Sequence, residues 1–154
     1  MAHTLREIFA LTDDEQFGAA LHDYVELRLE TQSLADLADC ERHLVSIRWL
    51  EMEVNNGGFH LYFYNSWGES YREAGEGLLA VGALRAAAIL SQACAQFPDG
   101  SPPVDQTARQ VQLPDDEAFE ALDQAFYGYP DDLSALVARY CRDRRGAFER
   151  TSAT

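Results

Sequence analysis

Lysine is absent from all 154 residues, so each of the 12 basic residues is an arginine, against 26 aspartates and glutamates. The formal net charge of −14 excludes a protein that holds nucleic acid or anionic lipid headgroups through a basic surface. A field of this sign attracts basic surfaces instead. A salt-adapted host or GC-rich coding also gives acidic, lysine-poor proteins, so the missing lysine alone names no function.

Cysteine and long hydrophobic runs are scarce as well. Cys40, Cys94 and Cys141 are widely spaced and odd in number, which is typical of a reducing cytoplasm rather than a disulfide framework. The N-terminus has no secretion signal, and the longest apolar stretch, residues 78–90, is interrupted and too short to cross a bilayer. We therefore expect a cytoplasmic protein that does not contact membranes.

The sequence shows no sustained alternation of apolar and polar residues, which would predict strands, and helical spacing recurs instead. The longest predicted helix covers about residues 34–54 and is apolar on nearly every side in its second half, which predicts a central, buried position. The sequence predicts one all-α domain over residues 1–154, a bundle of six to eight helices around this central helix.

Glycine and asparagine mark the predicted breaks between helices. Asn55-Asn56-Gly57-Gly58 is expected to end the central helix, because these residues tolerate the left-handed conformation of a helix C-cap. A short helix dense in aromatics is predicted from Phe59 to Trp67. Further helices are predicted on either side of Gly82, and another runs from Pro114 to Tyr127.

The charge is unevenly distributed along the chain. Residues 1–138 hold 24 acids and seven arginines, a net charge of −17, whereas the last 16 residues hold five arginines and two acids, a net charge of +3. The sequence thus ends in a short basic segment, residues 139–154. One hypothesis for this segment is contact with the acidic face of a second copy of the chain.

Residues 113–132 contain seven acids and no basic residue. On the predicted helix, Asp116, Glu120 and Asp123 fall on one face, about 6 Å apart, which is comparable to the phosphate spacing of nucleic acid. A fixed acidic helix can therefore present a row of charges that resembles a phosphate backbone. The residues predicted to bind a basic partner are Asp115, Asp116, Glu117, Glu120, Asp123, Asp131 and Asp132.

Sequence motifs of enzymes are missing. The chain lacks the nucleophile elbow, the phosphate-binding glycine loop, the dinucleotide fingerprint and the zinc-protease motif, so no catalytic residue, cofactor or metal is predicted. Cys40 and His43 share a helix face and could supply two metal ligands, but a metal would need further donors such as His22 or His60, so a buried thiol beside a surface histidine is the favoured interpretation. An enzyme with a pocket near Glu53 and His60 stays an alternative.

The segment Glu53-Val54-Asn55-Asn56-Gly57-Gly58-Phe59, followed by Tyr62-Phe63 and Asn65-Ser66, resembles a bacterial family of DNA-mimic proteins, many of whose members are known only as a domain of unknown function. Weaker similarity extends over about residues 44–142. Leu61 departs from the pattern, which has a glutamine there. The motif residues are expected to be structural, and they are Glu53, Asn55, Asn56, Gly57, Gly58, Phe59 and Asn65.

The resemblance implies an all-α homodimer whose acidic side chains are laid out like duplex phosphates and capture a DNA-binding transcription factor. Together with the charge, it predicts a binding protein, not an enzyme, that occupies the nucleic-acid site of a basic DNA-binding protein. Direct binding of nucleic acid is not expected. An immunity-type inhibitor of a toxin nuclease has the same electrostatics and stays open, since only an adjacent toxin gene would distinguish it.

Overall fold

A computed structural model describes residues 3–152, which form nine α-helices and four 3-10 helices, with no strand. The all-α prediction is confirmed, with one helix more than the expected six to eight. The α-helices are α1 (Leu5–Phe9), α2 (Asp14–Glu26), α3 (Asp39–Tyr64), α4 (Tyr71–Val81), α5 (Leu84–Cys94), α6 (Gln106–Gln112), α7 (Glu120–Tyr127), α8 (Leu133–Arg142) and α9 (Arg145–Ser152). The 3-10 helices are η1 (Leu27–Glu30), η2 (Leu34–Asp36), η3 (Ser66–Ser70) and η4 (Asp116–Phe119).

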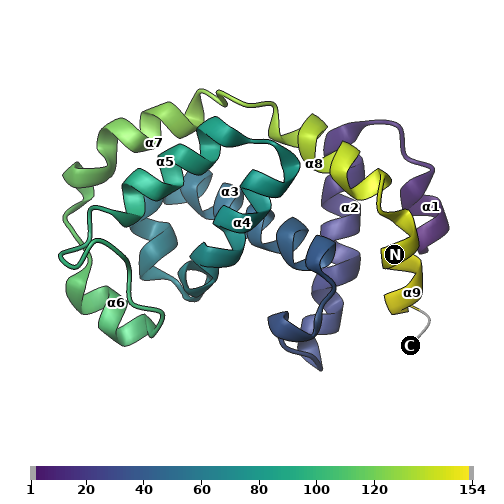
Figure 1. Cartoon of the computed structure of the whole chain (residues 1–154), viewed down its shortest axis with the longest axis horizontal. Helices are drawn as coiled ribbons and strands as arrows, with labels where there is room; N and C mark the ends of the chain where they lie inside the picture. The colour runs from purple at the N-terminus through teal and green to yellow at the C-terminus, as the bar shows by residue number, and fades with distance from the viewer. Residues whose placement is uncertain (1–2, 153–154) are drawn as a thin grey trace.

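Helix α3 runs through the middle of the molecule, with α1, α2, α8 and α9 gathered at one end and α5, α6 and α7 at the other (Figure 1). It contacts α2, α4, α6, α7 and α8. Its apolar seam is buried as predicted, since Leu44, Ile47, Leu50 and Val54 are at most 1% exposed. Met52 is 54% exposed, so the second half of the helix keeps one solvent-facing side.

The central helix begins later than predicted. Residues 34–36 form the short turn η2, in which the Asp36 carboxylate accepts hydrogen bonds from the backbone N–H and hydroxyl of Ser33. Leu37 is then extended, with ψ of 154°, and α3 starts at Asp39. Ser33 and Asp36 thus cap a separate turn rather than the central helix, because their contacts close within three residues.

The predicted break at Asn55-Asn56-Gly57-Gly58 is present, because Gly57 and Gly58 leave the helical conformation and divide α3 into two helical parts that meet in a kink. Gly58 has φ of 74° and ψ of −177°, a conformation that only glycine adopts readily, and the helix resumes at Phe59. The Phe59 backbone N–H donates to Asp123 Oδ1 at 2.8 Å. Asp123 of α7 therefore caps the second half of α3, 64 residues away in sequence.

A buried arginine fixes the far end of α3. Arg109 of α6 is 0% exposed, and its guanidinium donates to the backbone carbonyls of Phe63 (2.6 Å), Asn65 (2.8 Å) and Val104 (2.7 Å). The cation thus neutralises the negative end of the helix dipole and holds the preceding loop against it.

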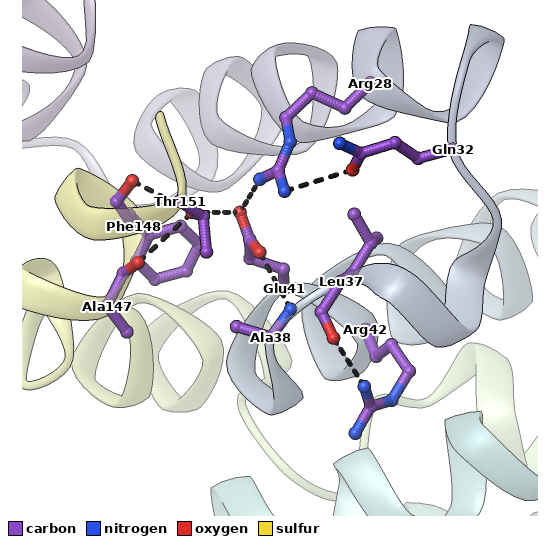
Figure 2. A network of polar contacts seen from close by, with 9 residues as sticks. All are labelled: Arg28, Gln32, Leu37, Ala38, Glu41, Arg42, Ala147, Phe148 and Thr151. Carbon is purple, nitrogen blue, oxygen red and sulfur yellow. Dashed lines mark hydrogen bonds and ion pairs between the residues drawn. The ribbon is translucent and has the colours of Figure 1, made fainter. Parts of the chain in front are cut away.

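The basic C-terminal segment folds back onto the chain. Figure 2 shows the buried Glu41 carboxylate accepting from the Arg28 guanidinium, the Ala38 N–H (2.9 Å) and the Thr151 hydroxyl (2.9 Å). Arg142 of α8 donates to Asp14 Oδ1 at 2.7 Å. These contacts use part of the basic segment within one copy of the chain.

Among the described residues, no helix combines the length and apolar character needed to cross a membrane.

Candidate functional site

Ion pairs divide the molecule into two unlike parts. In the described chain, every ion pair joins residues within 3–51 and 142–149. Residues 52–138 hold 13 acids and three arginines, and none of these takes part in an ion pair. Arg109 is buried on carbonyl groups, and Arg85 donates to the Pro130 carbonyl at 3.4 Å. None of the acids in this part is therefore held in a salt bridge among the described residues.

Four of the predicted contact residues form an exposed group where η4 leads into α7. We call them the acidic patch: Asp115, Asp116, Glu117 and Glu120. Beneath them Phe119 is 0% exposed, and its ring lies 6.4 Å from that of Phe59 and 5.7 Å from that of Phe63, centroid to centroid. This aromatic anchor holds the acidic patch against α3, so its carboxylates project from a fixed base.

The other three predicted contact residues accept backbone hydrogen bonds. Asp131 Oδ2 accepts from the N–H groups of Arg85 and Ala86, both at 2.9 Å, and thereby caps the start of α5. Asp132 caps α8 through the Ala135 N–H at 3.2 Å, and Asp123 caps the kinked half of α3. These three carboxylates hold helices in place, although Asp132 stays exposed to solvent.

Asp123 does not lie in the surface row expected from its spacing with Asp116 and Glu120. Residues 116–119 form a 3-10 turn, which changes the angle between successive side chains, and Asp123 points inward with 8% exposure. Burial raises the pKa of Asp123; the Phe59 N–H opposes this rise, and the negative charges of Asp116 and Glu120 add to it. The acidic patch and this buried carboxyl are thus electrostatically linked.

A polar cluster surrounds Glu51 and opens to a cavity of about 330 Å³. Tyr129 donates to Glu51 Oε2 at 2.8 Å, and Arg48 donates to Glu15 Oε1 at 3.1 Å. Burial raises the pKa of Glu51, against the lowering effect of the Tyr129 hydrogen bond. Ser134 donates to Glu15 at 2.6 Å, so the cluster joins α2, α3 and α8 through groups that bind one another.

Comparison with known proteins decides the family. The model of the DMP19-like protein family matches residues 35–144, which is most of the chain. The chain belongs to this family. It is a family of DNA mimics, as the resemblance of the Asn-Asn-Gly-Gly segment implied. No curated protein and no solved structure matches the chain significantly.

The residues that carry the family resemblance sit around the kink of α3. Asn55 donates to the Tyr129 hydroxyl at 2.7 Å, and Asn65 donates to Glu53 Oε2 at 2.9 Å. Gly58 provides the conformation of the kink, and Phe59 is buried behind it. The hydrogen bond from Asn65 holds Glu53 across the kink. The Glu53 carboxylate, which the enzyme alternative placed in a pocket, thus has a structural contact here.

One histidine and two acids of the described chain lie close enough to be considered as metal ligands. His22, Asp23 and Glu26 of α2 have ligand atoms within 4.8 Å of one another, with His22 Nε2 3.1 Å from Glu26 Oε2. A metal-binding histidine normally donates its other ring N–H to an acceptor, but His22 Nδ1 has no partner among the described residues. The contact is accounted for by a hydrogen bond on one helix face. Cys40 and His43 were the other candidate metal ligands, and His43 Nδ1 lies 2.7 Å from the Tyr140 hydroxyl.

Sequence reasoning missed Arg109 and the capping role of Asp123. Arg109 is the single basic residue between Arg85 and Arg139, which was the one signal that it had a special position. The partner of Asp123 lies 64 residues earlier, so its sequence neighbours gave no sign of it.

Proposed function

We propose that the protein is a DNA mimic that uses the acidic patch to occupy the nucleic-acid site of a basic DNA-binding protein, such as a transcription factor. The observation that carries this proposal is the acidic patch itself: four exposed carboxylates, without an ion-paired cation, in a part of the chain that has no ion pairs. Family membership supports the same function.

The electrostatics suit a partner that normally holds phosphates. A DNA-binding protein presents arginine and lysine side chains at positions that match a row of negative charges. Uncompensated carboxylates on a fixed base offer such a row without the conformational cost of ordering a flexible segment. Complex formation is therefore expected to weaken steeply with added salt.

The experiment is capture of the partner from the native lysate, with duplex DNA as competitor. The patch variant carries Asp115→Asn, Asp116→Asn, Glu117→Gln and Glu120→Gln. We expect the wild-type chain to retain a DNA-binding protein that duplex DNA displaces, and the patch variant to lose it while keeping its helical content.

A matched variant separates the position of the charges from their number. Glu69, Asp99, Asp143 and Glu149 are also exposed, so replacing them with their amides changes the net charge by the same amount. This control is expected to capture the partner nearly as well as the wild type. Capture that survives in the patch variant, or that is lost equally in both variants, contradicts the placement of the binding surface.

We also propose that the protein is a cytoplasmic homodimer. A groove of about 630 Å³ between α4 and α5 supports the dimer, because Leu79 and Leu84 beside it are 60% and 62% exposed. Arg72 and Glu76 line the same groove, so two copies related by a twofold axis can pair them reciprocally. Light scattering tests the dimer, since Leu79→Asp is expected to yield monomers.

The cytoplasmic location is supported by the three free cysteines, which suit a reducing compartment.

A further inference from the structure

An open groove lies between the end of α2 and the Trp67 side chain of η3. Its volume is about 560 Å³, and its lining combines carboxylates with apolar side chains. The lining residues are Asp23, Glu26, Leu27, Leu29, Glu30 and Trp67. Three negative groups and no basic group face this space, so its chemistry favours a cation that also has apolar surface.

The aromatic wall of the groove is held rigidly. Trp67 stacks on Trp49, with ring centroids 4.2 Å apart and an angle of 18° between the planes. Trp49 in turn donates from Nε1 to Glu26 Oε1 at 3.0 Å. Trp67 is 38% exposed. Because Trp49 covers one face of its ring, a ligand can contact the opposite face and the edges.

The carboxylates of the groove differ in how free they are. Glu26 is engaged by Trp49 and lies 3.1 Å from His22 Nε2. Asp23 and Glu30 are exposed, and neither forms an ion pair in the part of the chain that the structure describes. Two acceptors are therefore available beside an indole that is already in position.

We propose that this groove receives one arginine side chain of a protein ligand. The guanidinium stacks over the free face of Trp67 and donates to Asp23 and Glu30, while its aliphatic stem contacts Leu27. Arginine fits better than lysine because its planar group stacks on aromatic rings and binds carboxylates through two parallel hydrogen bonds. The groove is formed by other residues than the acidic patch, so this inference does not depend on the proposed function.

The test uses a capped Gly-Arg-Gly peptide and the matched Gly-citrulline-Gly peptide, which keeps the shape of the side chain and removes its charge. The chain has two tryptophans, so two indole N–H signals report on the groove in a nitrogen–proton correlation spectrum. We expect the arginine peptide to shift the Trp67 signal in a saturable way and the citrulline peptide to leave it unchanged.

Two double variants identify the binding site. Asp23→Asn with Glu30→Gln removes both free acceptors and is expected to weaken binding of the arginine peptide about tenfold, through the loss of charge-assisted hydrogen bonds. Asp116→Asn with Glu117→Gln removes the same charge elsewhere and is expected to leave the affinity within about twofold. An equal response to both peptides, no saturable shift, or equal weakening by both variants overturns the proposal.

Discussion

Replacing Gly58 with alanine tests the kink that joins α3 to α7. The φ of 74° with ψ of −177° is a conformation open almost only to glycine, so a side chain there costs about 1–3 kcal/mol in backbone strain. The added Cβ would lie 2.5 Å from Asp123 Oδ2, so the carboxylate must move away. The charge-assisted hydrogen bond to Phe59 is then lost, which costs about 1.5–3 kcal/mol.

Together these effects predict a loss of about 2.5–6 kcal/mol, a large share of the roughly 5–15 kcal/mol that stabilises a typical domain. The measurement is urea unfolding followed by circular dichroism. Gly100→Ala is the matched control, because Gly100 has φ of 81° and no atom within 4 Å of an added Cβ. It is expected to cost only the left-handed penalty of about 1–2 kcal/mol.

A double-mutant cycle isolates the contact with Asp123. In the Asp123→Ala background, the added methyl group at position 58 meets no carboxylate, so the cost of Gly58→Ala should fall to the backbone strain alone. Equal losses for Gly58→Ala and Gly100→Ala, or strictly additive effects in the cycle, would refute the steric reasoning.

Three further predictions concern buried charge. Arg109→Lys should lower stability by about 2–4 kcal/mol, because an ammonium group cannot reach all the carbonyls that the guanidinium holds, whereas the exposed Arg139→Lys should have little effect in the same thermal melt. Glu41→Gln removes the charge paired with Arg28 and should speed amide exchange in α9 before the rest of the chain, as seen by hydrogen-exchange mass spectrometry. The folded-state pKa of Asp123 is raised, so its contribution to stability is greatest below its unfolded pKa and is lost as the pH rises through its folded pKa. Neutralising the acidic patch should lower the folded-state pKa of Asp123, which a carboxyl-carbon NMR titration measures.

Local spacing predicted the central part of the fold well and its ends less well. The buried seam of α3 and the break at its glycines follow from residues close together in sequence, so both could be recognised. The start at Asp39 could not, because Ser33 and Asp36 satisfy each other within a separate turn. A helix does follow the break from Phe59, as predicted, but local sequence could not show that Asp123, from a distant segment, caps it.

The acidic site was predictable in composition but not in arrangement. Counting charges identified residues 113–132, yet an ideal helical wheel assigned Asp123 to the surface, since it could not include the 3-10 turn of η4. The packing of the basic C-terminal segment within its own chain was not predictable either. Arg142 lies over the ring of Phe17 at 4.4 Å, a contact that only the folded chain brings together.

The capping of α3 by Asp123 has a consequence for binding kinetics. Because this hydrogen bond and the Phe119 anchor hold α7 against the core, the acidic patch needs no rearrangement before a partner arrives. Encounter should therefore be limited by diffusion and steering, so added salt should slow association far more than it hastens dissociation. Loosening the kink should act differently, by lowering the fraction of molecules that are competent to bind at any salt concentration.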